Sequence, residues 1–202
     1  ENGNLERKRN MKKLILAVGR QCASGGHEIG EKIAQRLGIA FYDKKGLMEI
    51  ARGEVYDEVR AFYEEQPVNS LLYALAMRMD QEQLGQAPFL LIRRLADQGS
   101  CVIIGRCSGY IFRRDPEAVT LFVHADRDMR IERVMKYEGI SRREAEKLVD
   151  KTDEDRAAFY QYYTRRQWGM AENYELCLDS GKLGIDGTVD AVLDYLERRK
   201  FL

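Results

Sequence analysis

The sequence lacks any long apolar run, and this absence excludes one large class of proteins. No stretch of its 202 residues approaches the ~20 consecutive apolar residues of a transmembrane helix. No signal peptide is recognisable either, so we expect a cytoplasmic protein without a membrane partner. A chain of this length can bury one good core, which predicts a single domain.

An excess of charge of one sign is also missing. Lys+Arg and Asp+Glu number 33 each, so the formal net charge is zero. This balance argues against a general nucleic-acid-binding surface, although arginines can still cluster locally. Cysteine is scarce, with four residues and no C-x-x-C pair. We therefore expect reduced, mostly buried thiols, assign no residue as a metal ligand, and leave the oligomeric state open.

What the sequence does contain is a glycine-rich loop between a strand pattern and a helix pattern. Residues 14–18 are apolar and fit a buried strand, whereas Ile29, Ile33, Ala34 and Leu37 share one face of a helix. A helix that begins directly after such a loop points backbone N–H groups at a phosphate. The stretch from Gly19 to Gly30 is therefore a candidate phosphate-binding loop.

The match to the phosphate-loop template G-x-x-x-x-G-K-[ST] is imperfect. The span from Gly19 to Gly25 is one residue too long, Gly26 stands where Lys should be, and His27 stands where Ser or Thr should be. On spacing alone, phosphate binding and a plain strand-to-helix turn both remain open. The candidate phosphate- and ATP-binding residues are Gly19, Arg20, Ser24, Gly25, Gly26 and His27.

Strand patterns alternate with helix patterns along the rest of the chain, which predicts an α/β fold with a parallel sheet covered on both faces. Ligands of such sheets bind outside the carboxyl ends of the strands. Asp43, Arg106 and the pair 179–180 follow strands and should meet there. The expected strands are residues 14–18, 39–42, 101–104, 119–123 and 175–178.

Five stretches resemble the cytidylate-kinase-like family, a divergent branch of the P-loop nucleoside monophosphate kinases. They are G-R-Q-C-A-S-G-G-H-E-I-G with F-Y-D-K, C-V-I-I-G-R-C-S-G-Y-I, R-I-E-R-V-M-K-Y-E-G-I-S, D-E-D-R-A-A-F-Y-Q-Y-Y, and the tail that begins W-G-M-A-E-N-Y. Together they cover nearly all of residues 13–197 in the right order.

This resemblance implies a three-layer P-loop NTPase fold with helical NMP-binding and lid segments. Residues 1–12 would be a disordered tail and 13–202 a single kinase-like domain, with the NMP-binding excursion at about 44–87 and the lid at about 137–155. The implied reaction is transfer of the γ-phosphoryl group of ATP to CMP or dCMP, assisted by Mg²⁺. The expected partners are nucleotide substrates.

The resemblance also suggests roles for single residues. Arg106 corresponds to the arginine that holds the acceptor nucleotide, with a structural salt bridge as the alternative. Asp43 would position the acceptor or cap a helix. Arg133 and Arg156 are the lid arginines chosen as catalytic, together with His27, for which a solvent-facing position is the alternative.

Other lid and strand-end residues have an equally good structural interpretation. Arg142 and Arg143 fit a solvated helix face, and Asp126 and Asp128 fit a helix start better than a magnesium site. The residues at 179–182 could form a base-side loop or a simple turn. An aromatic set could stack on a base but is more typical of core packing: Phe159, Tyr160, Tyr162, Tyr163 and Trp168.

Two rival functions stay open at this point. Members of the family carry Gly where Ala23 stands and Arg where His27 stands, and an Arg there could replace the missing Lys. Their absence favours a catalytically weak nucleotide-binding regulatory protein. Because similar lids occur across the fold, a kinase of another small metabolite is the second rival.

Overall fold

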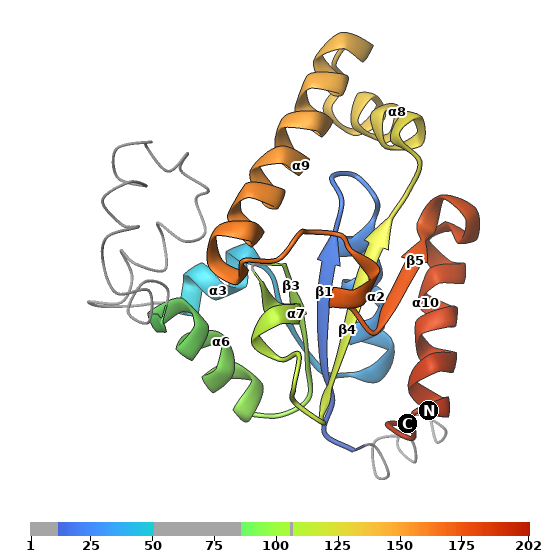
Figure 1. Cartoon of the computed structure of the whole chain (residues 1–202). Coiled ribbons are helices and arrows are strands. Elements are labelled where there is room, and N and C mark those ends of the chain that lie inside the picture. Colours follow the sequence, from blue (N-terminus) through green and yellow to red (C-terminus); the bar gives the residue numbers. More distant parts are fainter. Residues whose placement is uncertain (1–11, 51–85, 106) are drawn as a thin grey trace.

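The computed structural model describes residues 12–50, 86–105 and 107–202. Its centre is a sheet of five strands, all parallel, in the order β2-β3-β1-β4-β5 (Figure 1). The predicted α/β fold with a five-stranded parallel sheet is therefore confirmed. The strands are β1 (Ile15–Arg20), β2 (Ala40–Tyr42), β3 (Cys101–Ile104), β4 (Ala118–His124) and β5 (Leu176–Asp179).

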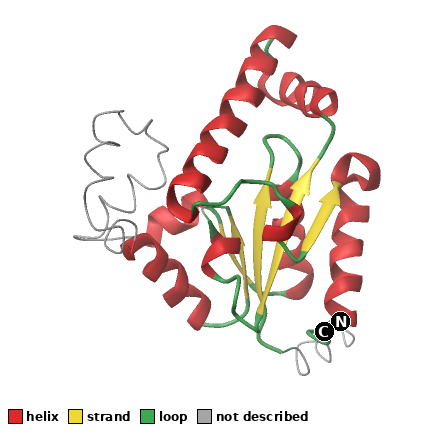
Figure 2. Cartoon of the chain, viewed as in Figure 1, coloured by secondary structure: helices red, strands yellow, loops and turns green. Residues whose placement is uncertain are grey.

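Helices connect the strands and cover both faces of the sheet, giving the three layers visible in Figure 2. The last helix begins at Ser180 and contains a kink at Gly184, where φ is 70° and ψ is 176°. The helices are α2 (Gly26–Leu37), α3 (Lys44–Ile50), α6 (Gln86–Asp97), α7 (Ser108–Ile111), α8 (Arg127–Glu138), α9 (Arg142–Thr164), the 3₁₀ turn η2 (Ala171–Asn173) and α10 (Ser180–Arg198).

Alternation along β1 divides the core into two clusters, one on each face of the sheet. Leu14, Leu16 and Val18 pack with α2 and α10, whereas Ile15 and Ala17 pack with α3, α6 and α7. Burial on both faces is why this strand is a continuous apolar run instead of an alternating one. The central strand is thereby held rigidly, and the loop that follows it starts from a fixed position.

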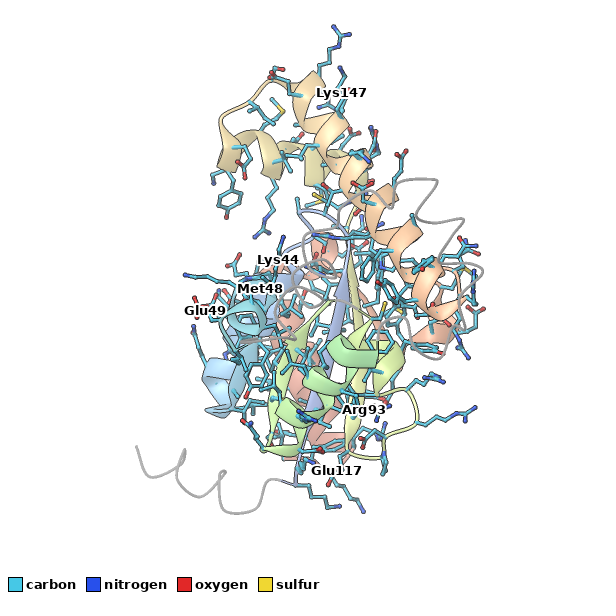
Figure 3. All side chains as sticks on the ribbon, turned by 90° about the vertical axis from the view of Figure 1, so that its left-hand side faces the viewer. Lys44, Met48, Glu49, Arg93, Glu117 and Lys147 are labelled. Carbon is cyan, nitrogen blue, oxygen red and sulfur yellow. The ribbon has the colours of Figure 1, made fainter. Side chains whose placement is uncertain are left out.

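A third, smaller cluster joins α8 and α9 into a helical pair. Ile131 and Val134 of α8 contact Ala145 and Val149 of α9, and Ala23 of the glycine-rich loop packs against them. A capping box begins α9: the side chain of Ser141 accepts from the N–H of Glu144, and the side chain of Glu144 accepts from the N–H of Ser141. Figure 3 shows Lys147 at the outer end of this pair, far from Arg93 and Glu117 at the opposite end of the molecule.

The carboxyl ends of all the strands lie on the side of the sheet where α8 and the start of α9 stand (Figure 1). Most of the predicted tail (1–12) and of the predicted NMP-binding excursion (44–87) falls outside the described residues. Within the described ranges, the longest helices are too polar to cross a bilayer.

Candidate active site

The glycine-rich loop leads directly from β1 into α2. Backbone φ is +57° at Ala23 and +81° at Gly25, and Gly25 occupies the position just before the helix without a side-chain cap. The first N–H groups of α2 therefore have no partner inside the helix and carry its positive end. This is the geometry that a phosphate group requires of a helix N-terminus.

The missing lysine has a packing explanation. A Cβ atom at Gly26 would lie 2.5 Å from Cβ of Arg20 and 3.3 Å from Cβ of Val123. The stem of Arg20 thus occupies the space that a side chain at position 26 would need. The guanidinium group of Arg20 continues to Gly105, where a Cβ would lie 2.0 Å from its Nη1. Arg20, one of the predicted loop residues, therefore places its guanidinium group at the carboxyl end of β3.

Ser24, predicted to face phosphate, has its hydroxyl directed into the loop. Ser24 is 2% exposed, and its Oγ donates to the carbonyl of Gln21 at 3.0 Å. Its own carbonyl accepts from Oγ of Ser180 at 2.5 Å, and the same Ser180 hydroxyl lies 3.0 Å from the carbonyl of His124. Asp179 accepts from the N–H of Gly181 at the start of α10. The strand end at 179–180 therefore acts as a helix cap and a support for the loop.

His27 and Asp43 lie against each other, although His27 was predicted to bind ATP and Asp43 to bind the acceptor nucleotide. Nε2 of His27 is 3.0 Å from Oδ2 of Asp43, and the ring of Phe41 meets the imidazole edge-on. Oδ1 of Asp43 accepts from the N–H of Gly46 at 2.8 Å, which caps α3. Burial alone would raise the pKa of Asp43, but the N–H of Gly46 and the contact with His27 outweigh it, so the pKa is lowered.

Arg133 of α8 reaches across to the phosphate loop. Its Nη2 lies 2.6 Å from Oε2 of Glu28, and its Nη1 would lie 3.0 Å from a Cβ at Gly25. The guanidinium also faces the ring of Tyr137 at 5.4 Å from the ring centre. The guanidinium group of Arg133 therefore lies next to the N-terminus of α2. Glu28, in the first turn of α2, holds it there.

Arg130, one turn away from Arg133 on α8, has a structural position. It is 6% exposed, and its Nη1 lies 2.6 Å from Oδ2 of Asp153 on α9. Oδ1 of Asp153 accepts from the N–H of Cys22 at 2.7 Å. Arg130 also donates to the carbonyls of Ala125 and Cys22. This buried ion pair ties the glycine-rich loop to both helices of the lid.

Arg156, one turn after Asp153 on α9, lies beside the end of β1. Its Nη1 donates to the carbonyl of Arg20 at 3.3 Å. Its Nε is buried and has no hydrogen-bond partner among the described residues. A buried donor without a partner is costly, so this group is suited to bind an anion that the described residues do not provide.

A hollow of about 650 Å³ lies between the glycine-rich loop and the lid. This volume is in the range that small-molecule ligands occupy. Arg133 and Arg156, both predicted as catalytic, are brought together on its lid side, and His27 lies on its loop side. The loop residues that line it are Arg20, Gln21, Cys22, Ala23, Gly25, Gly26, His27 and Glu28.

Several other predicted residues have structural contacts or cannot be placed. Arg106 lies outside the described residues, so its acceptor role stays a prediction. Asp126 caps α8 by accepting from the N–H of Asp128, which pairs with Arg142. Arg143 is exposed. Three of the predicted aromatic residues pack on one another at the end of α9, with ring centres 4.6 Å apart for Phe159 and Tyr163 and 4.9 Å apart for Tyr162 and Tyr163, whereas Trp168 packs edge-on against Phe122.

Sequence reasoning missed Glu28 and Ser108 as parts of this site, and it missed the contact of Asp153 with the glycine-rich loop. Glu28 had a usable signal, since it is an acidic residue in the first turn of the predicted phosphate-binding helix. Asp153 and Cys22 are 131 positions apart, and nothing in a single sequence couples them. Ser108 lies two residues after Arg106 in the stretch C-V-I-I-G-R-C-S-G-Y-I, but the sequence alone suggested no role for it.

Residues 15–182 match the Cytidylate kinase-like family. An uncharacterized protein from Eubacterium ventriosum ATCC 27560 superposes with a TM-score of 0.73 at 27% identity, over 92% of this chain and 99% of that chain. Shikimate kinase from Bacteroides thetaiotaomicron gives a TM-score of 0.57 at 14% identity, over 92% of this chain and 99% of the other.

Shikimate kinase from Acinetobacter baumannii gives a TM-score of 0.51 at 10% identity, over 95% of this chain and 96% of the other. At such identities the likeness shows the P-loop kinase fold and no more. No curated protein sequence matches the chain. The glycine-rich loop, the strand order 2-3-1-4-5 and the match over residues 15–182 agree, and the chain belongs to the cytidylate kinase-like family of P-loop kinases.

Proposed function

We propose that this chain is an ATP-dependent phosphotransferase that transfers the γ-phosphoryl group of ATP to CMP or dCMP. One observation carries the proposal: Arg133 and Arg156 line the same hollow as the N-terminus of α2. Phosphoryl transfer depends on positive charge and N–H donors around the phosphate oxygens. Two guanidinium groups and a helix N-terminus supply both.

The hollow fits the phosphate chain of ATP. Gly25 and Gly26 line this hollow and lie at the start of α2, where backbone N–H groups have no partner inside the helix. Arg133 and Arg156 both line the hollow, and their guanidinium groups supply positive charge for the phosphate oxygens. ATP bound there would supply the phosphoryl group, and the backbone of the loop would hold it through N–H donors.

Mg²⁺ has less support from the side chains. Among the described residues, no three His, Cys, Asp or Glu side chains gather as metal ligands, and His27 replaces the Ser or Thr of the motif. A magnesium ion that arrives with ATP is held mainly by phosphate oxygens and water.

Arg133 and Arg156 have distinct tasks in this proposal. Arg133 exchanges its contact with Glu28 for a phosphate oxygen and so replaces the cation that the loop itself lacks. Arg156 of α9, which lies beside the end of β1, stabilises the charge that develops between the two substrates. α8 and α9 already pack on the loop through Ala23, and this packing limits the access of water to the hollow.

A kinase of another small metabolite, with a hydroxyl group as acceptor, is the second candidate. The contact between His27 and Asp43 favours it, because a carboxylate that orients an imidazole is the arrangement of a general base. An acceptor phosphate is already ionised and needs no such base. The family match favours CMP, whereas the His27–Asp43 pair favours an alcohol.

A coupled ADP-release assay distinguishes these candidates. Purified full-length chain is incubated with ATP, Mg²⁺ and either a nucleoside monophosphate or a small polyhydroxy compound. Turnover with CMP or dCMP that persists in His27→Gln supports the first candidate. Turnover with an alcohol that is lost in His27→Gln supports the second. ATP binding without turnover on any acceptor contradicts both and leaves a regulatory nucleotide-binding protein.

A further inference from the structure

A small, partly open cavity lies next to the hollow, on the other side of Arg20 and Arg156. Its volume is about 40 Å³, roughly the space that three water molecules need by the same measure. It lies between the ends of β1 and β3, α7 and the aromatic end of α9. The described residues that line it are Gly19, Arg20, Gly105, Cys107, Ser108, Gly109, Arg156, Phe159, Tyr160, Trp168 and Tyr174.

Two buried polar atoms belong to this lining and have no hydrogen-bond partner among the described residues. They are Oγ of Ser108 and Nε of Arg156, and Ser108 is 1% exposed. A buried hydroxyl or guanidinium N–H without a partner costs free energy, and folded proteins rarely keep one. Two of them around a single cavity indicate an occupant that binds both.

Among the described residues that line the cavity, the charged side chains are two arginines. Arg20 and Arg156 line it, and no Asp or Glu is among the described lining residues. Burial raises the pKa of Tyr160 and of Tyr174, so both phenols are neutral at physiological pH and do not offset the two arginines. An occupant with a negative charge is therefore favoured over a neutral or cationic one.

We propose that this cavity binds one small oxyanion, the phosphoryl or carboxylate group of the acceptor substrate, through Ser108 and Arg156. The inference rests on the proposed function, because the acceptor is the substrate of that reaction. The cavity is too small for a nucleobase but has room for the few atoms of one oxyanion.

Position relative to the ATP hollow supports this assignment. Arg20 and Arg156 are the two side chains that line both spaces, so they form the wall between them. A group in the small cavity and a phosphate chain in the hollow would share these cations. Guanidinium groups that contact both reactants can hold them in register for transfer.

Orthophosphate is the probe for the first test, titrated by calorimetry into the full chain at constant ionic strength. Ser108→Ala should weaken phosphate binding by about tenfold or more, because a hydrogen bond to a charged ligand is lost. Arg156→Lys keeps the charge, loses the Nε–H donor, and should weaken binding similarly. Ser100→Ala is the matched control, since Oγ of Ser100 accepts from the N–H of Leu14 at the opposite end of the sheet.

Thermal unfolding separates a ligand site from a merely structural serine. Without phosphate, Ser108→Ala should unfold at the same or a higher temperature than the wild type, because it removes an unpartnered hydroxyl. Ser100→Ala should unfold at a lower temperature and keep its phosphate affinity. Equal phosphate affinity in Ser108→Ala and the wild type would overturn the proposal.

Competition identifies the source of the oxyanion. CMP, a sugar phosphate and a polyhydroxy carboxylic acid are each tested for displacement of phosphate from the wild type and from Ser108→Ala. Displacement by one of them in the wild type assigns the oxyanion to that acceptor class, and displacement by none overturns the link to the acceptor. If phosphate binding depends on Ser108 but no acceptor gives ADP release, the proposed kinase function is refuted and the cavity site is not. If Ser108→Ala turns over with an unchanged KM for the acceptor, the role of the cavity is refuted and the kinase function is not.

Discussion

The buried contact between Arg130 and Asp153 gives the sharpest stability prediction. Asp153→Ala removes the carboxylate that accepts from Nη1 of Arg130 at 2.6 Å and from the N–H of Cys22 at 2.7 Å. The side chains of the pair are 7% and 17% exposed. Breaking a buried ion pair from one side costs about 3–5 kcal/mol, because the remaining charge is left without its partner.

Two carbonyls moderate this cost. Arg130 keeps its contacts with Ala125 at 3.1 Å and with Cys22 at 3.2 Å, so its guanidinium group is not left bare. We therefore expect a loss of about 3 kcal/mol, at the lower end of that range. With a urea m-value of about 2–3 kcal/mol per molar, the unfolding midpoint should fall by about 1–1.5 M.

Asp150→Ala is the matched control for the same measurement. Asp150 lies on the same helix and pairs with Arg127 of α8 through two hydrogen bonds, but both side chains are about half exposed. A surface pair contributes little, so the midpoint should barely move. Asp153→Asn should fall between the two, since an amide oxygen can still accept from Cys22. Equal urea midpoints for Asp153→Ala and Asp150→Ala would refute the claim that the buried pair stabilises the fold more than the exposed pair does.

Three further predictions concern the loop and its supports. Ser180→Ala removes the hydroxyl that donates to the carbonyl of Ser24 and should cost about 1 kcal/mol, lowering Tm by about 3 °C; an unchanged Tm in calorimetry would contradict that support. Gly25→Ala forces a Cβ onto a residue with φ of +81° and to within 3.0 Å of Nη1 of Arg133, so stability should fall by about 1–2 kcal/mol and ATP affinity should fall with it. The pKa of Asp43 lies below its ordinary value of 3.8. The ionised carboxylate therefore stabilises the fold at pH values above 3.8, and this contribution is lost as the pH falls through the lowered pKa. The urea midpoint should therefore drop more for the wild type than for Asp43→Asn between about pH 5 and pH 3, and parallel curves would contradict the shift.

Local patterns in the sequence were sufficient for the fold. The apolar run at 14–18 and the other four strand patterns predicted the parallel sheet, because buried parallel strands need continuous apolar residues. The capping box at Ser141 and Glu144 was predictable since its two residues are three positions apart. Arg133 and Arg156 were chosen from helical spacing and family motifs, and the structure brings both to one hollow.

The contacts that define the site chemistry lay beyond such patterns. The pairs Glu28–Arg133 and Cys22–Asp153 join residues more than 100 positions apart, and only the folded chain brings them together. The sequence alone does not explain why position 26 lacks the lysine of the motif. The structure does, because the stem of Arg20 fills the space that a side chain at position 26 would need. Restoring the motif with Gly26→Lys would therefore displace Arg20 instead of adding a phosphate cation.

Calorimetric titration of ATP into the full chain tests the central claim, that the hollow between the loop and the lid binds the phosphate chain. We expect one binding site in the wild type and affinity about 10–100-fold weaker in Arg156→Ala, because charge-assisted hydrogen bonds to phosphate are lost. Arg143→Ala removes an exposed arginine of the same helix and should bind as the wild type does. No ATP binding in the wild type, or equal affinity in Arg156→Ala and Arg143→Ala, would contradict the account.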